Sequence, residues 1–314
     1  TAPFEEVVEI RFDPSGGFTI LVGSHSHGQG HETIYRQLAA EFLSLPSDQL
    51  RIVQGDTDAV PHGRGSFGSR TMMAGGTAFF NAARKVVGRG KQIAAHLLEV
   101  EVADIEFRES SFVVPGTDLC VSLLEVAQAA FVPTMIPRGM ELGLDGKSSN
   151  ADAGMAFPNG CHVCEVEIDP ETGQVNLARY TVVDDVGRPV NPLLVEGQVI
   201  GGIAQGAGQA LMEQINYDQG SGQLLTGSFV DYAMPRAQDF LPIEMSTHDV
   251  PTQTNPLGVK GAGEAGTVGA LPAVMSAISD ALYQAGVDRI DMPATPQNVW
   301  TALQAAGQAR SGTG

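Results

Sequence analysis

Cysteine, positive charge and long apolar runs are all scarce in this sequence. Its 314 residues include three cysteines, Cys120, Cys161 and Cys164, which are too few for a disulfide framework. Lysine and arginine total 18 against 36 aspartates and glutamates, and the net charge of −18 argues against nucleic-acid binding. No apolar run approaches the ~20 residues of a membrane-spanning helix. We therefore expect a globular protein without a membrane span, in a reducing compartment such as the cytoplasm. A periplasmic location stays open, because the natural N-terminus could lie upstream of residue 1.

Glycine, by contrast, is abundant, and its distribution is informative. The 38 glycines follow no collagen-like period and gather at 23–30, 63–76, 197–208 and 258–269. Such clusters are typical of loops, because glycine adopts backbone conformations that other residues avoid and lets the chain approach a ligand closely. With 43% hydrophobic residues, the chain is ample for a buried core and long enough for two lobes.

Local patterns predict a mixture of hairpins and helices. Strand-like runs around turn residues predict hairpins at 8–24, 105–114 and 161–183, and further strands at 228–237 and 242–251. Apolar periodicity predicts helices at 31–45 and 74–98. Capping residues and prolines predict further helix starts at Ser122, with Glu125 in capping-box spacing, and at Asn191, Pro272 and Pro296. Residues 133–160 lack periodicity and are expected to connect two lobes or form a lid. We predict an α+β fold in two lobes, residues 1–150 and 151–314.

Three glycine clusters share one pattern, in which a strand is followed by glycine with Gln or Ser and then by a helix start. They are HGQGHE (27–32), GRGSFGSRT (63–71) and VEGQVIGG (195–202). Free N–H groups at a helix start bind anions, and the amides of Gln29 and Gln198 suit a heterocycle with both donors and acceptors. One such cluster alone is more simply a turn, but three together favour a binding site. None is a Walker A or Rossmann fingerprint.

The fourth cluster, GVKGAGEAGTVG (258–269), contains a single acid, Glu264, four residues after Lys260. A carboxylate among glycines has few side chains with which to pair. It is either a solvated turn residue or a group directed at a ligand, and the cluster alone leaves both interpretations open.

The CHVC segment (161–164) has zinc-like spacing but no second ligand pair. Strand alternation would place Cys161 and Val163 on one face and His162 and Cys164 on the other. A strand is therefore favoured, and a zinc or redox module is the alternative.

Two other polar groups have simple explanations. His27 and His31 are four residues apart, but the glycines between them argue against a helical metal pair. Asp184 and Asp185 are expected to be solvated turn acids.

Four segments, in order, resemble the molybdenum-cofactor-binding large subunit of the xanthine oxidase family. They are SHGQGHETIYRQLAAEFL, GDTDAVPHGRGSFGSR, VEGQVIGGIAQGAGQAL and GVKGAGEAGTVGALPAV. The chain is most similar to the carbon-monoxide-dehydrogenase-like and aldehyde-oxidase-like branch. The resemblance extends over about residues 5–305 and corresponds to the C-terminal portion of a full large subunit.

The resemblance implies roles for individual residues. Glu264 would be the general base in the oxidation or hydroxylation of a small substrate carbon, with water as the oxygen source, and Lys260 and Gly263 would precede it as the family pattern requires. The other matched positions would contact a molybdopterin cofactor in its cytosine dinucleotide form: Gly28, Gln29, Gly30, Gly68, Ser69, Arg70, Thr71 and Gln198. Arg70 would lie near the dinucleotide phosphates. No protein side chain would ligate the molybdenum, which the pterin dithiolene holds.

The resemblance also implies partners. The chain has neither a four-cysteine iron–sulfur signature nor a Rossmann-type flavin fingerprint. Clusters of the 2Fe–2S type and FAD would therefore lie on an iron–sulfur subunit and an FAD subunit. An N-terminal half of the large subunit, on another chain or missing from this sequence, would complete the pocket. The alternative function is a non-catalytic, cofactor-binding or accessory subunit of such a complex. Carbon monoxide, aldehydes, purines and N-heterocycles all stay open as substrates.

Overall fold

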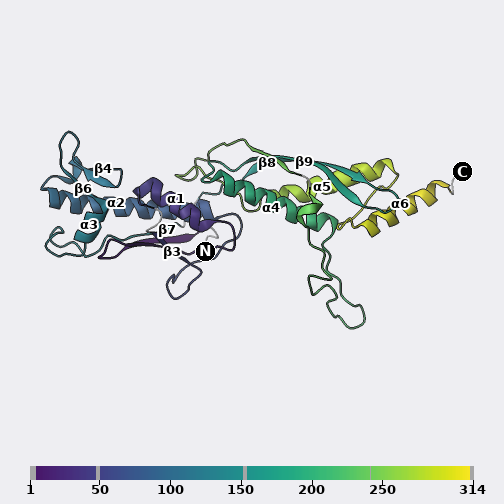
Figure 1. Cartoon of the computed structure of the whole chain (residues 1–314), viewed down its shortest axis with the longest axis horizontal. Helices are drawn as coiled ribbons and strands as arrows, with labels where there is room; N and C mark the ends of the chain where they lie inside the picture. Colours follow the sequence, from purple (N-terminus) through teal and green to yellow (C-terminus); the bar gives the residue numbers. More distant parts are fainter. Residues whose placement is uncertain (1–4, 47–49, 151–153, 241, 312–314) are drawn as a thin grey trace. The chain divides into compact units, whose positions relative to one another are not determined.

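The computed structural model describes residues 5–46, 50–150, 154–240 and 242–311, and the chain folds into two compact units (Figure 1). The first unit comprises Thr1–Ala156 and Pro251–Gly261, and the second comprises Phe157–Val250 and Ala262–Gly314. Helices and mixed sheets occur in both units, which confirms the predicted α+β class. The predicted lobe boundary after residue 150 adjoins residues outside the described part of the chain and stays a prediction.

A four-stranded mixed sheet forms one layer of the first unit. Its strands are, in spatial order, β3 (Leu50–Gln54), β2 (Phe18–Val22), β1 (Glu6–Phe12) and β7 (Gly146–Asn150). β1 pairs antiparallel with both neighbours. β2 and β3 are parallel, because helix α1 (His31–Leu43) carries the chain back between them. The hairpin predicted at 8–24 and the helix predicted at 31–45 are confirmed.

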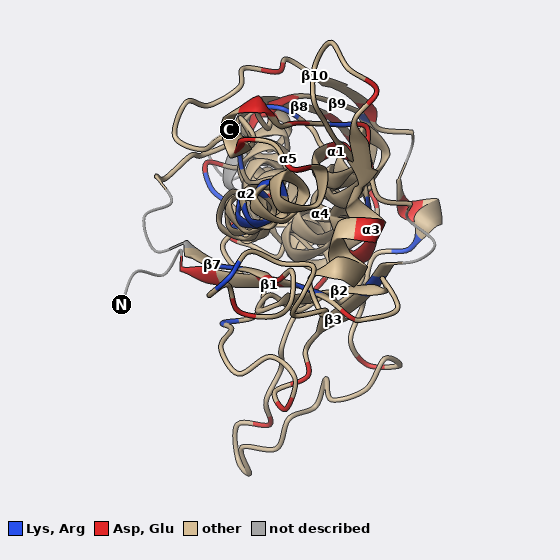
Figure 2. Ribbon diagram, turned by 90° about the vertical axis from the view of Figure 1, so that its left-hand side faces the viewer, with Lys and Arg blue, Asp and Glu red and all other residues tan. Residues whose placement is uncertain are grey.

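Helix α2 (Thr77–Leu98), which continues a π-helical turn η2 (Thr71–Gly76), packs along β1 and β7. Its inner face buries small and apolar side chains, including Ala78, Phe79, Ala82 and Val86. The basic residues of α2 are blue in Figure 2. Lys85 and Arg89 on α2 donate to backbone carbonyls in and just before β7. These bonds help to place a strand within a segment that the sequence predicts to be irregular.

A satellite sheet completes the first unit. After a 3₁₀ turn η3 (Val102–Asp104), it consists of β4 (Glu106–Arg108), β5 (Ser111–Val113) and β6 (Cys120–Ser122), followed by helix α3 (Leu123–Ala129). Ser122 Oγ accepts a hydrogen bond from Glu125 N at 3.2 Å, and the Glu125 carboxylate accepts one from Ser122 N at 2.8 Å. The hairpin predicted at 105–114 and the predicted capping box are confirmed.

Helices pack on a three-stranded sheet in the second unit. The strands are, in order, β10 (Glu244–Thr247), β9 (Val175–Asp185) and β8 (Asn159–Ile168). The helices are α4 (Pro192–Leu211), α5 (Ala265–Gln284) and α6 (Pro296–Ser311). Between them lies a core that includes Val182, Val199, Ile203, Val274, Ile278 and Val299. Asn191 Oδ1 accepts from Leu194 N at 3.0 Å, so the predicted start of α4 is confirmed, as are the β8–β9 hairpin and the start of α6.

Three local predictions for the second unit are wrong. Residues 195–202 lie inside α4 and form no loop. Helix α5 begins at Ala265, so Pro272 lies within the helix instead of starting it. Residues 228–237 form turns that lead into a 3₁₀ turn η4 (Ala237–Asp239), not a strand.

Helix α5 is, among the described residues, the one helix long and apolar enough to cross a membrane by length and composition. It packs on α4 and β8, and it buries Ala270, Val274 and Ile278 in the core of the second unit. We therefore assign it to that core.

Candidate functional site

Two of the predicted loops meet in the first unit: the HGQG loop (residues 23–30) and the GSR loop (residues 63–71). A Cβ built on Gly63 would lie 2.3 Å from the carbonyl oxygen of Gly23. Gly65 N donates a hydrogen bond to the same oxygen at 3.2 Å. Because the backbones approach more closely than a side chain would allow, glycine is required at the crossing. The two loops consequently form one surface.

Two glycines of this surface have open space where a side chain would be. Gly28 and Gly68 have φ values of +114° and +59°, and no described atom lies within 4 Å of a Cβ built on either residue. Gly30 (φ +77°) is the N-cap of α1, and Ser69 has φ +53°, a conformation uncommon outside glycine. The helix starts that follow offer N–H donors and the positive end of a helix dipole. The geometry therefore fits an anionic, heterocyclic cofactor of the molybdopterin type.

Gln29 and Thr71 have partners within their own loops. Gln29 Oε1 accepts a hydrogen bond from His27 N at 2.6 Å, and Gln29 Nε2 lies 3.2 Å from His27 Nε2. Thr71 Oγ1 lies 3.2 Å from Ser66 Oγ. These bonds stiffen the two loops, and a cofactor contact by either side chain stays a prediction.

The side chain of Arg70, near the end of the GSR loop, is buried. Its Nη1 donates to Glu6 Oε2 at 3.1 Å and to Gly65 O at 2.8 Å, and its Nη2 donates to Glu5 O at 2.5 Å. The guanidinium carbon lies 4.9 Å from the ring centroid of Phe67. Glu6 is buried as well, and burial raises the pKa of its carboxyl although the guanidinium opposes that shift. Arg70 therefore braces the loop against β1, and the phosphate contact implied by the resemblance stays a prediction.

Lys260 and Gly261 also belong to the first unit, and Gly261 lies against the GSR loop. A Cβ built on Gly261 would lie 2.6 Å from Ser69 Cβ and 2.7 Å from Ser69 O. The backbone of this segment therefore packs directly on the GSR loop, with Lys260 half-buried beside it. We refer to the HGQG loop, the GSR loop and Lys260 as the first half-site of the candidate site.

Gln198 and Glu264 are held near each other in the second unit, because α4 and α5 pack closely. A Cβ built on Gly266, two residues after Glu264, would lie 2.2 Å from the carbonyl oxygen of Val199. One built on Gly202 would lie 3.1 Å from Gly266 Cα. The glycines that the sequence assigns to a loop at 195–202 thus serve helix packing. We refer to Gln198, Gly263 and Glu264 as the second half-site of the candidate site.

Glu264 is the N-cap of α5, and both it and Gly263 are exposed. Its carbonyl oxygen accepts a hydrogen bond from Val268 N at 3.0 Å, which closes the first helical turn. A carboxylate at this end of a helix is favoured by the helix dipole. The Glu264 side chain is therefore accessible, and the packing of α5 fixes the position of its backbone.

The close contact between α4 and α5 yields a prediction with a matched control. Gly202→Ala would place Cβ 2.8 Å from Thr267 N, so the helices must separate, and we expect a loss of ~1–3 kcal/mol in the free energy of unfolding. Gly201→Ala, on the exposed face of the same helix with no described atom within 4 Å, should gain ~0.4–1 kcal/mol. Chemical denaturation of both variants checks the pair. Equal effects would contradict the packing described above.

The cysteines of the CHVC segment lie on β8, as predicted, and are free thiols. Cys161 is exposed and Cys164 is half-buried. Burial raises the pKa of the Cys164 thiol to about 11, which makes it a poor metal ligand. In the described part of the chain, no group of three or more His, Cys, Asp or Glu residues could hold a metal ion.

The prediction for Asp184 is wrong. Asp184 lies on β9 with its side chain 2% exposed, next to His162, and His162 in turn contacts Tyr180. Strand alternation places His162 on the opposite face of β8 from Cys161, and this pattern could have predicted that the histidine side chain points into the core. No sequence pattern marked its two partners.

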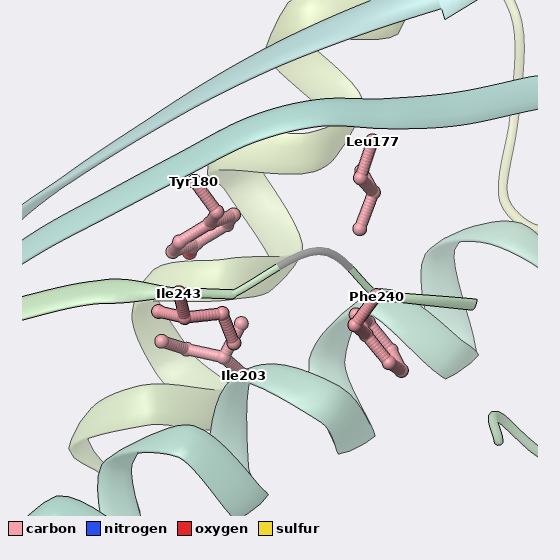
Figure 3. Close-up of a pocket in the computed structure, with 5 residues that line it drawn as sticks. All are labelled: Leu177, Tyr180, Ile203, Phe240 and Ile243. Carbon is pink, nitrogen blue, oxygen red and sulfur yellow. The ribbon is translucent and has the colours of Figure 1, made fainter. Parts of the chain in front are cut away.

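A cavity in the core of the second unit is too small for a substrate. It has a volume of about 10 Å³, room for one water at most, and it is bounded mostly by apolar side chains (Figure 3). Its lining residues are Leu177, Tyr180, Ile203, Phe240 and Ile243. We interpret it as a packing gap.

The chain is similar to several known proteins. Residues 1–241 match the family described as the molybdopterin cofactor-binding domain. The carbon monoxide dehydrogenase large chain of Hydrogenophaga pseudoflava is 35% identical over 297 residues, and the nicotine 6-hydroxylase large subunit of Paenarthrobacter nicotinovorans is 35% identical over 306 residues. The solved structure of quinoline 2-oxidoreductase from Pseudomonas putida 86 matches with a TM-score of 0.86 at 34% identity.

The chain spans well under half the length of these relatives. The matches cover 94% and 97% of this chain but 37% of each of the two large chains. For the quinoline 2-oxidoreductase structure the coverage is 96% of this chain and 38% of the other.

Proposed function

The chain belongs to the molybdopterin cofactor-binding domain family, and on that basis we propose that it is the cofactor-binding part of a molybdenum hydroxylase. The proposed reaction oxidises or hydroxylates a small substrate carbon, in carbon monoxide, an aldehyde, a purine or an N-heterocycle. The proposed cofactor is molybdopterin in its cytosine dinucleotide form. The similarity to large chains of carbon monoxide dehydrogenase and nicotine 6-hydroxylase supports this proposal.

One observation carries the proposal: the two half-sites are joined by a very short piece of chain. Gly261 packs on the GSR loop of the first half-site, and Glu264 belongs to the second. Only two residues lie between them, so even an extended chain keeps their Cα atoms within ~11 Å. We propose that a cofactor bound at the first half-site also contacts Glu264.

The chain's own residues would divide the work as follows. Backbone N–H groups at Gly28, Gly30 and Gly68 would bind electronegative cofactor atoms, and the Gln198 amide would hydrogen-bond the pterin. When bound, the molybdenum cofactor supplies a two-electron acceptor. Glu264 would take a proton at its carboxylate from the water that provides the oxygen atom, a step that requires hydrogen-bond reach and a fixed base. The packed start of α5 would provide that fixed position.

The N-terminal portion of a large subunit, on another chain or preceding this sequence, is proposed to cover the site. Glu264 and Gly263 are exposed in this chain, and water at the site would weaken the electrostatic effect of the base. The segment 215–234 also exposes large apolar side chains, among them Ile215, Leu225, Phe229 and Val230. We propose that the N-terminal portion of a large subunit covers these surfaces, and that iron–sulfur and FAD subunits accept the electrons.

The chain purified alone is therefore expected to aggregate or to lack molybdenum and activity, whereas the complex purified from its host should contain both. The missing interface should belong to the obligate class, above ~2,000 Å². Size-exclusion chromatography with metal analysis of both preparations checks this. A monodisperse, molybdenum-loaded and active single chain would show that no covering partner is needed.

Gln198→Ala tests cofactor binding separately from folding. The substitution removes the side-chain amide, and one lost hydrogen bond should lower the free energy of unfolding by only ~1 kcal/mol. It also removes the proposed contact between Gln198 and the pterin. We expect molybdenum content to fall several-fold with little change in melting temperature. Gln297→Ala, an exposed glutamine on α6, is the matched control and should change neither quantity. Full molybdenum content in Gln198→Ala would remove Gln198 from the proposed site.

A further inference from the structure

A buried polar network lies beneath the first turns of α5. It joins His162 on β8 to Tyr180 and Asp184 on β9. His162 Nδ1 lies 2.7 Å from the Tyr180 hydroxyl, and His162 Nε2 lies 3.4 Å from Asp184 Oδ1. The His162 and Asp184 side chains are 6% and 2% exposed. Because the two ring nitrogens have polar partners on opposite sides, the imidazole cannot turn without losing both.

Helix α5 rests directly on this ring. A Cβ built on Gly269 would lie 2.4 Å from His162 Nε2 and 2.6 Å from His162 Cε1, closer than a real side chain could come. Gly269 is five residues after Glu264, little more than one helical turn. The same turns pack on α4 through Gly266. The helix start that carries Glu264 is thus held by α4 and by the His162 ring.

Packing alone would not require polar groups at this place. Buried ionisable groups lose hydration, and apolar residues of similar volume are often at least as stabilising. Among the described residues, Asp184 Oδ2 has no hydrogen-bond partner, which adds to that cost. The network does hold the His162 ring in one orientation, and the backbone of α5 can pack against that fixed ring.

We propose that Tyr180, His162 and Asp184 are positioning residues that fix the first turns of α5 and thereby the location of the Glu264 carboxylate. The inference rests on the proposed role of Glu264 as the base. It adds a support for that base which lies outside both half-sites.

Hydrogen exchange on the full chain tests the positioning directly, without cofactor or substrate. Tyr180→Phe removes one hydroxyl and Asp184→Asn removes one charge, and both keep the side-chain volume. We expect amide exchange at residues 266–270 to accelerate ~10-fold or more in both variants, with less than ~2-fold change at 275–284. Tyr283→Phe, an exposed tyrosine on the same helix, is the matched control and should leave both segments unchanged.

Turnover of the complex separates this inference from the proposed function. If the network positions the base, the two variants lower kcat ~10-fold or more with KM and molybdenum content unchanged. Unchanged exchange at 266–270, or equal acceleration along all of α5, would overturn the positioning role. Normal turnover in Glu264→Gln would instead overturn the proposed function, and the exchange result would still decide what the network does.

Discussion

Glu264→Gln is expected to abolish turnover while leaving the fold and the bound cofactor intact. Glutamine keeps the size and the hydrogen-bonding capacity of the side chain but cannot accept the proton. Removal of an ordinary acid–base group costs ~10²–10⁴-fold in rate. We expect a loss beyond that range here, because the same residue would also generate the nucleophile. The assay is turnover of the purified complex with whichever carbon monoxide, aldehyde or N-heterocycle the wild type oxidises.

The matched control is Asp280→Asn, which makes the same chemical change at an exposed position on α5. It should retain full turnover. Molybdenum content has to be measured in both variants, so that a lost cofactor is not mistaken for a lost base. Near-normal turnover in a molybdenum-replete Glu264→Gln enzyme would rule out the proposed base.

Arg70→Met should produce the largest loss of stability. The substitution leaves Glu6 buried without its guanidinium partner, and breaking a buried ion pair in this way costs ~3–5 kcal/mol. It also removes the hydrogen bonds that hold the GSR loop through Gly65 O and Glu5 O. Chemical denaturation of the full chain measures the effect. Adding Glu6→Gln should recover much of the loss, because the unpaired charge is then gone.

The exposed pair Arg108–Glu106 provides the control for this prediction. Arg108→Met should cost no more than ~1 kcal/mol, since exposed ion pairs contribute little. If Arg70→Met proved as mild as Arg108→Met, the bracing role of Arg70 would be wrong. If the Arg70→Met variant kept its stability but lost the cofactor, the phosphate contact implied by the resemblance would be favoured instead.

Local chemistry made much of the fold predictable from the sequence. The Ser122–Glu125 capping box, the Asn191 cap and Pro296 each mark a helix start through groups only a few residues apart. The hairpins follow from alternation around turn residues. Strand β7 could not be predicted in this way, because its pairing with β1 joins residues far apart in the chain.

Glycine misled the prediction wherever tertiary packing offset its low helix propensity. Gly202 and Gly266 lie in α4 and α5, where close contact between the helices requires the absence of a side chain. Read by propensity alone, the same residues suggest loops. Helix α5 likewise continues through Pro272, which sequence rules place at a helix start.

Some features of the candidate site could be predicted from the sequence, and others could not. Gly28 and Gly68 have positive φ values in open turns, and their contact with a cofactor stays a prediction. The buried environment of Arg70 depends on Glu6, 64 residues away. The network around His162 depends on Asp184, in a different strand. Long-range contacts of this kind leave no local pattern, so the sequence could not separate a buried support from a ligand contact.

An experimental structure of the purified complex with its cofactor tests the central claim most directly. Our account predicts one molybdopterin in contact with both half-sites, with the backbone of Gly28 and Gly68 and the amide of Gln198 bound to it. It also predicts the Glu264 carboxylate within hydrogen-bond reach of a water beside the metal. A cofactor that contacts only one half-site, a Glu264 carboxylate directed away from it, or zinc held by the CHVC segment in place of molybdenum would contradict the account.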